Sequence, residues 1–252
     1  MKPIALQLYS LRERAKEDLA GVLKEVAAMS YLGVEPAGMY GNDPKDVRKM
    51  LDDLELTCCS MHGAFPTKDT IQQRVDEAGA LGTDMIISGG IGAKDLVSLD
   101  ALKAGCDRLN AAAAVVADAG LRYGYHNHDQ EFAIVGDELA YDVMMREVPG
   151  MFSQLDVYWA ANFGAVDVPA VLARYAARIP LLHIKDGPLV KGEPHTAVGK
   201  GKMDIPAVIR AADPDVVQWL IVELDHCATD MTEAVADSAR YLIGEGLGKG
   251  RD

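Results

Sequence analysis

Residues 180–186 read Pro-Leu-Leu-His-Ile-Lys-Asp, and residues 219–225 read Trp-Leu-Ile-Val-Glu-Leu-Asp. Both stretches are short apolar runs that end in charged or metal-binding side chains. Runs of this length and composition favour buried strands. A charged group placed in an apolar strand is costly unless it is paired or bound to a metal. The two stretches therefore predict strands whose carboxyl ends carry a functional site.

The same pattern runs through the whole chain, where β-rich runs alternate with segments of helical spacing. The predicted strands are Ile4–Tyr9, Gly33–Pro36, Thr57–His62, Asp84–Ser88, Arg122–His128, Ser153–Trp159, Pro180–Lys185 and Trp219–Leu224. Eight such units form either a barrel or a doubly wound sheet. No GxGxxG motif follows the first strand, and polar residues recur at the ends of at least six strands. We therefore predict an α/β fold, a (β/α)₈ TIM barrel that spans residues 1–252 as one domain.

Composition narrows the classes of function that this chain can have. Its 252 residues are 49% hydrophobic, which suits a large core, and they carry a formal net charge of −13. Such a charge repels nucleic acids and anionic membranes, so we expect neither as a partner. No apolar run reaches about 18 residues, and the first residues lack a secretory signal. The four cysteines form no CxxC pair. We expect a soluble, cytoplasmic protein with reduced thiols.

Four consecutive predicted strands end in residues that can bind a metal, namely Glu131, Asp156, His183 and Glu223. Alone, each carboxylate would more often be salt-bridged within the barrel, and the histidine would be a hydrogen-bonded core residue. A barrel gathers all four strand ends around one mouth, which favours a shared site. Three carboxylates and one imidazole suit Mn²⁺, Mg²⁺ or Co²⁺, and Zn²⁺ remains an alternative.

Several motifs carry a resemblance to a known family. They are LQLYSLR (6–12), YHNHDQEF (125–132), QLDVYWA (154–160), LLHIKD (181–186), VGKGKMD (198–204) and VELD (222–225). The chain resembles the sugar phosphate isomerase/epimerase family of xylose isomerase-like TIM barrels. The resemblance implies that Glu131, Asp156, His183 and Glu223 bind a divalent metal, with Mn²⁺ preferred. His128 is the alternative to Glu131 as the metal ligand that follows the fifth strand, because the HNHD stretch departs from the simpler segment of ketose 3-epimerases.

Further residues are predicted to line a substrate pocket at the same mouth. The imidazoles at 126 and 128 share one strand face because strand side chains alternate. The lysine at 185 binds a substrate oxygen or phosphate, or else pairs with a neighbouring carboxylate. The loop 195–202 is glycine-rich, and we expect it to be mobile over the mouth. The predicted substrate-binding residues are His62, His126, His128, Trp159, Lys185, Asp186 and Lys202.

The chemistry that fits such a site is proton abstraction beside a carbonyl, with a metal acting as a Lewis acid on the enediolate. By resemblance, Glu131 and Glu223 are the catalytic acid and base. We expect an isomerase or epimerase that acts on a small carbohydrate: a sugar, sugar phosphate or keto-sugar. The alternative is a lyase or dehydratase that acts on a keto-cyclitol or 3-keto-glycoside.

Two further interpretations are disfavoured. A DNA-repair endonuclease of this barrel type would need a richer histidine set and a basic face. A barrel that only binds a sugar would not need the intact ligand set. Related barrels often pair, so the resemblance also leaves room for a homo-oligomer.

Overall fold

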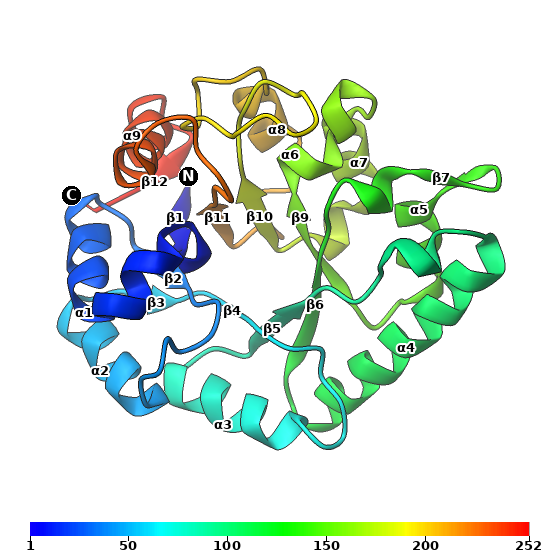
Figure 1. Cartoon of the computed structure of the whole chain (residues 1–252), viewed down its shortest axis with the longest axis horizontal. Coiled ribbons are helices and arrows are strands. Elements are labelled where there is room, and N and C mark those ends of the chain that lie inside the picture. The colour runs from blue at the N-terminus through cyan, green and yellow to red at the C-terminus, as the bar shows by residue number, and fades with distance from the viewer. Residues whose placement is uncertain (252) are drawn as a thin grey trace.

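The computed structural model describes residues 1–251 and shows a nearly closed barrel of parallel strands ringed by helices (Figure 1). Among these residues, nine strands follow one another in the order β3-β2-β1-β11-β10-β9-β6-β5-β4. Their recorded pairings are all parallel. The predicted (β/α)₈ barrel is confirmed. Asp252, the last residue of the expected 1–252 domain, lies outside the described residues.

The barrel strands coincide closely with the predicted apolar runs. They are β1 (Lys2–Gln7), β2 (Gly33–Glu35), β3 (Thr57–Cys58), β4 (Met61–His62), β5 (Met85–Ser88), β6 (Arg122–His126), β9 (Phe152–Asp156), β10 (Leu181–Ile184) and β11 (Trp219–Val222). The predicted third strand is interrupted and forms both β3 and β4. A parallel bridge between Ala37 and His62 brings β4 back beside β2, which nearly closes the ring. Outside the ring, β12 (Gly248–Lys249) pairs with β1, and β7 (Ile134–Val135) forms a hairpin with β8 (Glu138–Leu139).

Helices connect the strands and cover the outside of the barrel. The α-helices are α1 (Arg12–Ala28), α2 (Pro44–Asp53), α3 (Ile71–Leu81), α4 (Leu99–Asp118), α5 (Ala140–Glu147), α6 (Val157–Ala160), α7 (Val168–Tyr175), α8 (Ile205–Ala211) and α9 (Met231–Gly244). Short 3-10 turns are η1 (Leu8–Leu11), η2 (Ala93–Asp95), η3 (Gln130–Phe132), η4 (Asn162–Gly164) and η5 (Ala176–Arg178). Among the described residues, none of the helices combines the length and apolar character that crossing a membrane requires.

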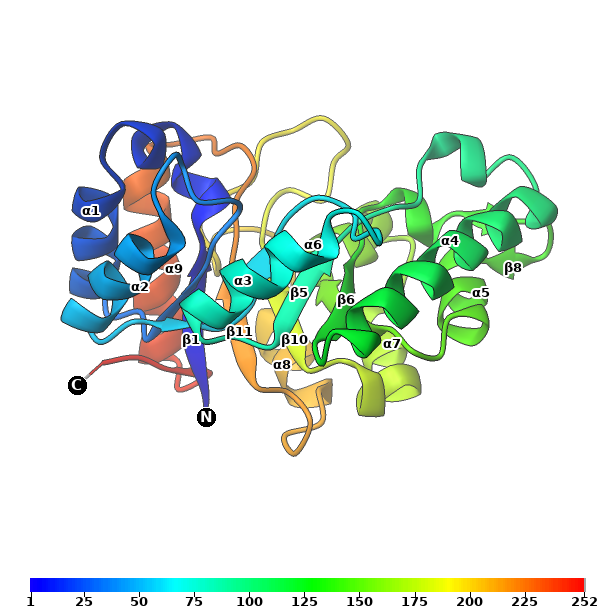
Figure 2. The ribbon, with the colours of Figure 1, turned by 90° about the horizontal axis from the view of Figure 1, so that it is seen from below.

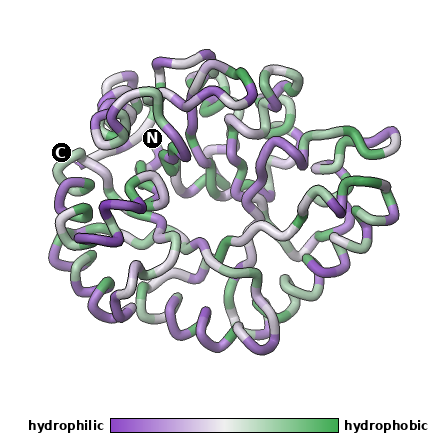
Figure 3. The backbone as a smooth tube through the Cα atoms, in the orientation of Figure 1, coloured by the Kyte–Doolittle hydropathy of each residue, from purple (hydrophilic) through white to green (hydrophobic). Residues whose placement is uncertain are grey.

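Local sequence explains where these helices begin. Asp43 and Ser98 accept backbone hydrogen bonds at the starts of α2 and α4, as capping residues do. Hydrophobic and hydrophilic segments alternate along the outer helices (Figure 3), because each helix turns one face to the sheet. Figure 2 shows both termini on the same side of the molecule.

The inside of the barrel is divided into two levels. The first is an apolar cluster, here called the apolar plug, of Ala5, Cys59, Met85, Ile87, Leu181 and Ile221. Strand side chains alternate, so the residue two positions further along a strand points to the same side. Two positions beyond Ala5, Leu181 and Ile221 stand the buried polar residues Gln7, His183 and Glu223. Together with Glu35, His126 and Gln154, which are also polar and buried, they form what we call the polar layer. Because all the strands are parallel, this layer lies toward their carboxyl ends.

Candidate metal centre

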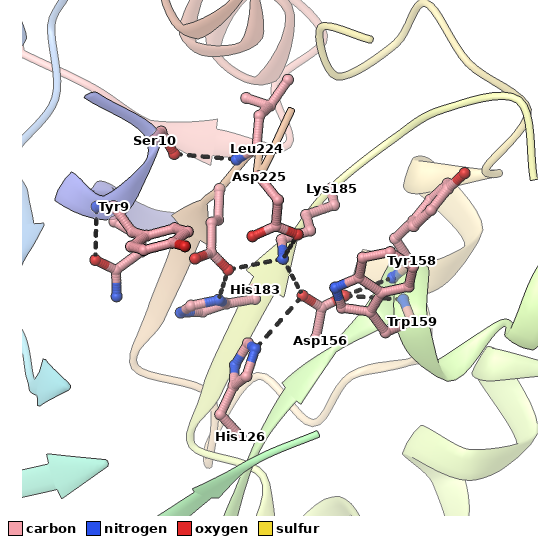
Figure 4. Close-up of polar contacts among 12 residues, drawn as sticks. Tyr9, Ser10, His126, Asp156, Tyr158, Trp159, His183, Lys185, Leu224 and Asp225 are labelled. Atoms are coloured by element: carbon pink, nitrogen blue, oxygen red, sulfur yellow. Dashed lines mark hydrogen bonds and ion pairs between the residues drawn. The ribbon is translucent and has the colours of Figure 1, made fainter. Parts of the chain in front are cut away.

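Four side chains converge at the carboxyl end of the barrel, where a cation could be held. His126 and Asp156 are the last residues of β6 and β9, His183 lies in β10, and Glu223 directly follows β11. All four are buried, and one ligand atom from each lies within 4.8 Å of those of the others. Figure 4 shows His126, Asp156 and His183 turned toward one another around Lys185. The predicted residues Asp156, His183 and Glu223 are thus brought together, with His126 as their fourth member.

Lys185 supplies a buried positive charge beside this four-residue cluster. Its Nζ lies 2.9 Å from Asp156 Oδ2, 2.8 Å from Glu223 Oε2 and 2.9 Å from Asp225 Oδ2. Burial would lower the pKa of Lys185, but the three carboxylates raise it above its usual value. For Glu223 the effects have the opposite sign: burial would raise its pKa, but the positive charges of Lys185 and His183 hold that pKa well below its usual value. Both groups are therefore charged at neutral pH.

Asp156 uses its two carboxylate oxygens differently. Oδ1 accepts backbone hydrogen bonds from Tyr158 at 3.0 Å and Trp159 at 2.9 Å, which caps the short helix α6. Oδ2 is buried and forms an ion pair with Lys185, and it accepts no further hydrogen bond from the described residues. Burial raises the pKa of Asp156 despite the nearby lysine. One fixed oxygen and one under-coordinated buried oxygen are what a carboxylate metal ligand needs.

His183 lies between two carboxylates. Its Nδ1 is 2.8 Å from Glu223 Oε2, and its Nε2 is 2.6 Å from Glu35 Oε2. Burial would lower the pKa of His183, but Glu35 and Glu223 raise it to about 10. Burial would raise the pKa of Glu35, whereas His62, His183 and Ser60 bring it down to about 2. In this arrangement the imidazole is cationic and Glu35 is ionised.

His126 and His62 share the side-chain oxygen of Gln154. His126 Nδ1 lies 3.1 Å from Gln154 Oε1, and His62 Nε2 lies 2.6 Å from the same atom. The other nitrogen of His126 faces Asp156, at 3.9 Å from Oδ2. Burial lowers the pKa of both imidazoles, that of His126 well below its usual value, and the nearby His183 charge acts in the same direction. Both rings are therefore neutral, the form in which histidine binds metals.

Glu131 does not join the cluster. It lies in η3, beyond the end of β6, and its carboxylate accepts hydrogen bonds from Tyr125 Oη at 2.6 Å and His128 N at 2.9 Å. His126, the last residue of β6, reaches the cluster in its place. The ring of His128 contacts His126 at a centroid distance of 5.1 Å and approaches Trp159 at 6.4 Å. It lies next to the cluster without entering it.

Asp186 and Lys202 serve the loop that follows β10. The carboxylate of Asp186 accepts backbone hydrogen bonds from Gly187, Gly199, Gly201 and Met203, at 2.8 to 3.0 Å. The bonds from Gly199 and Gly201 tie the loop 195–202 to the barrel, and those from Gly187 and Met203 hold the chain on either side of it. The mobility of this loop stays a prediction. Lys202 is exposed, and its backbone N–H donates to Gly187. Neither side chain is placed in the cluster.

The profile of the xylose isomerase-like TIM barrel family matches residues 23–244. The chain belongs to this family. A sugar phosphate isomerase/epimerase from Parabacteroides distasonis is 25% identical, with a TM-score of 0.83 over 98% of this chain and 96% of that one. An L-ribulose 3-epimerase is 17% identical, with a TM-score of 0.72 over 98% and 95%. A probable 3-DHS dehydratase from Bacillus anthracis is 13% identical, with a TM-score of 0.75 over 96% and 98%. Among curated proteins, none matches this chain.

Three residues beside the cluster of this xylose isomerase-like barrel, Gln154, Asp225 and His195, were not predicted from the sequence. Gln154 and Asp225 each lie two positions from a predicted ligand, so strand alternation could have placed them beside it. His195 gave no such signal, because it lies in a loop. It is buried against Trp159, with ring centroids 5.3 Å apart, and its Nδ1 accepts a hydrogen bond from the Asp225 N–H. Burial and the nearby Lys185 lower the pKa of His195 to about 4.

Proposed function

We propose that this protein is a divalent-metal-dependent isomerase or epimerase that acts on a sugar, sugar phosphate or keto-sugar. The observation that carries this proposal is the buried cluster of His126, Asp156, His183 and Glu223 at the mouth of the barrel. Active sites of TIM barrels lie at this end. The similarity to a sugar phosphate isomerase/epimerase and to an L-ribulose 3-epimerase supports the same class of substrate.

The cluster suits a divalent cation in its donor atoms. It offers two imidazole nitrogens and two carboxylate oxygens, and the buried Asp156 Oδ2 has the Lys185 ammonium, at 2.9 Å, as its ion-pair partner. Mixed nitrogen and oxygen donors suit Mn²⁺, Co²⁺ and Zn²⁺ better than Mg²⁺, and we propose Mn²⁺ first. When bound, such an ion would supply Lewis-acid polarisation of a substrate carbonyl. In this proposal His126 takes the ligand position expected for Glu131.

The chain's own groups account for proton transfer and orientation. Glu223 is kept ionised by Lys185 and His183, so it can accept a proton from a carbon next to a carbonyl. The Lys185 ammonium can hold an oxygen on which negative charge develops. Trp159 lies beside this ammonium, with its ring centroid 5.5 Å from Nζ, and its buried Nε1 has no hydrogen-bond partner in residues 1–251. An aromatic face with a free donor suits one side of a sugar.

A dehydratase is the second candidate, and a specific feature favours it. Loss of a hydroxyl next to the reacting carbon needs a proton donor near the base, and Lys185 Nζ lies 2.8 Å from Glu223 Oε2. The similarity to a probable 3-DHS dehydratase points the same way. Substrates of this reaction would be keto-cyclitols or 3-keto-glycosides.

The test begins with chelator-treated protein to which Mn²⁺, Co²⁺, Zn²⁺ or Mg²⁺ is restored. Each form is incubated in D₂O with ketoses, ketose phosphates and 3-keto-glycosides, and the products are followed by proton NMR. An isomerase or epimerase exchanges one carbon-bound proton for deuterium without loss of mass. A dehydratase loses water, which mass spectrometry detects. Turnover that is unaffected by removal and return of metal would overturn the proposal.

A further inference from the structure

Beneath the four-residue cluster lies a second set of buried side chains that is fully hydrogen-bonded. Its centre is Glu35, which is 0% exposed. Glu35 accepts hydrogen bonds from Gln7 Nε2 at 2.7 Å, Gln154 Nε2 at 2.6 Å, His183 Nε2 at 2.6 Å and the hydroxyl of Ser60. Two bonds go to each oxygen, which uses the whole acceptor capacity of the carboxylate. Glu35 therefore holds its neighbours in one defined arrangement.

The direction of these bonds fixes the amide of Gln154. Since Glu35 can only accept, the Gln154 atom that faces it is the NH₂ group, and the other atom is the oxygen. An amide oxygen only accepts, so both imidazole nitrogens that approach it must carry hydrogens. These are His126 Nδ1 and His62 Nε2. The lone pair of neutral His126 is thereby left on Nε2, the nitrogen that faces Asp156.

His183 differs, because both of its nitrogens face carboxylates and carry hydrogens in metal-free protein: Nε2 toward Glu35 and Nδ1 toward Glu223. Glu35 lies outside the four-residue cluster and keeps the hydrogen on Nε2, so Nδ1 is the nitrogen that would give up its hydrogen to bind a metal. His62, His126 and His183 also converge closely enough to hold a metal ion by themselves. However, the nitrogens that these three rings turn toward Glu35 and Gln154 are occupied as donors. A second ion on that side would have to displace hydrogen bonds to both residues.

We propose that Glu35 and Gln154 are positioning residues that fix which ring nitrogen of His183 and of His126 binds a metal, and that they limit the site to one metal ion. That ion would lie on the side of Asp156 and Glu223, and His62 would not be a ligand. The claim of a single metal ion rests on the proposed metal-dependent function. The assignment of hydrogens to the histidine rings does not. Acceptors that orient metal-binding histidines typically change metal affinity by about 10–100-fold.

The first measurement needs no metal. In metal-free protein labelled with ¹⁵N, long-range proton–nitrogen spectra report which ring nitrogen of each histidine carries a hydrogen. We expect His126 to be protonated on Nδ1 and unprotonated on Nε2, with its signals assigned by their loss in His126→Gln. In Gln154→Met we expect His126 to become a mixture of tautomers. Protonation of wild-type His126 on Nε2 would overturn the inference, whatever the protein does with metals.

The second measurement titrates metal-free protein with Mn²⁺ and follows the free ion by electron paramagnetic resonance. We expect one ion per chain and an affinity about 10–100-fold lower in Gln154→Met and in Glu35→Gln. The matched control is His62→Ala, which removes a partner of Gln154 and should keep one ion with an affinity within about threefold. Two ions in the wild type that fall to one in His62→Ala would overturn the inference. So would unchanged affinity in folded Gln154→Met.

The two proposals can fail separately. If Mn²⁺, Co²⁺ and Zn²⁺ all fail to bind wild-type protein, the proposed function falls and the claim of one ion falls with it. The tautomer assignment is still decided by the NMR result. If metals bind and turnover depends on them, but His126 has the other tautomer, only the positioning role is lost.

Discussion

The apolar plug and the polar layer occupy the same barrel, and β1, β10 and β11 contribute to both. In β10, Leu181 belongs to the plug and His183 to the polar layer. Ile221 of β11 belongs to the plug, and Glu223, which directly follows β11, belongs to the polar layer. The two residues of each pair are two positions apart, so both side chains face the interior of the barrel. The difference between the two levels is therefore a difference of side chain alone, on one continuous backbone.

The comparison shows how one scaffold separates stability from chemistry. Burial of apolar surface in the plug contributes roughly 25 cal/mol for each Å² removed from water. The polar layer buries charges, which costs free energy unless every charge is paired. The charges of this layer are paired, since Glu35 accepts four hydrogen bonds and Glu223 contacts His183 and the neighbouring Lys185. We infer that the polar layer is kept for its site and that the plug supports it.

The largest expected effect is a loss of turnover that distinguishes Glu223 from Glu131, two buried glutamates at the same end of the barrel. Glu223→Gln keeps the shape of the side chain but removes the proton acceptor, and we expect about 10²–10⁴-fold lower turnover. Glu131→Gln changes a carboxylate that bonds Tyr125 and the backbone, so turnover should stay within about tenfold. Both are measured on any sugar that the wild type converts. Equal losses in the two variants would restore Glu131 to the catalytic role that the sequence suggested.

The next largest effect removes the buried cation of the cluster. Lys185→Met leaves Asp156 and Glu223 without their shared partner, which we expect to cost about 3–5 kcal/mol of unfolding free energy in metal-free protein. A divalent ion can replace the lost positive charge. Thermal unfolding should therefore shift upward on addition of Mn²⁺ by more in Lys185→Met than in the wild type. A smaller shift in the variant would show that Lys185 does not compete with the metal for these carboxylates.

Much of this architecture could be predicted from the sequence, because short apolar runs indicate the strands of a barrel. The predicted run Pro180–Lys185 contains β10, and Trp219–Leu224 contains β11. These two runs and the run Ser153–Trp159 also contain His183, Glu223 and Asp156, which the structure brings together. The single interruption, between β3 and β4, depends on how the chain closes the ring and has no signal in the run Thr57–His62.

The fourth member of the cluster was harder to predict because several candidate side chains follow one another after Tyr125. Which of them enters the barrel depends on where β6 ends. The strand ends at His126, and the chain then turns into η3, which directs Glu131 toward Tyr125. The pairing of Glu35 with His183 could not be predicted either. It joins β2 to β10 across the barrel, a contact that only the closed sheet creates.

The polar layer also predicts a dependence of stability on pH that the plug does not share. The pKa of Glu35 is lowered to about 2 in the fold, so its contribution is present above its unfolded value near 4.5 and is lost as pH falls toward 2. The pKa of His183 is raised to about 10, so its contribution is complete below 6.5 and is lost as pH rises toward 10. Urea unfolding of metal-free protein should give highest stability between about pH 4.5 and 6.5. A curve that is flat from pH 6.5 to 9 would contradict the pairing of Glu35 with His183.

The smallest effect tests the plug itself. Ile221→Val removes one buried methylene, which we expect to cost about 0.5–1.5 kcal/mol of unfolding free energy. Because no titratable group of the polar layer loses a partner, the cost should be the same at every pH of the previous experiment. Mn²⁺ affinity should stay within about threefold, since Glu223 lies two residues further along the backbone. A pH-dependent cost, or a larger loss of metal affinity, would show that the two levels are coupled, and that the plug helps to place the metal centre as well as to stabilise the barrel.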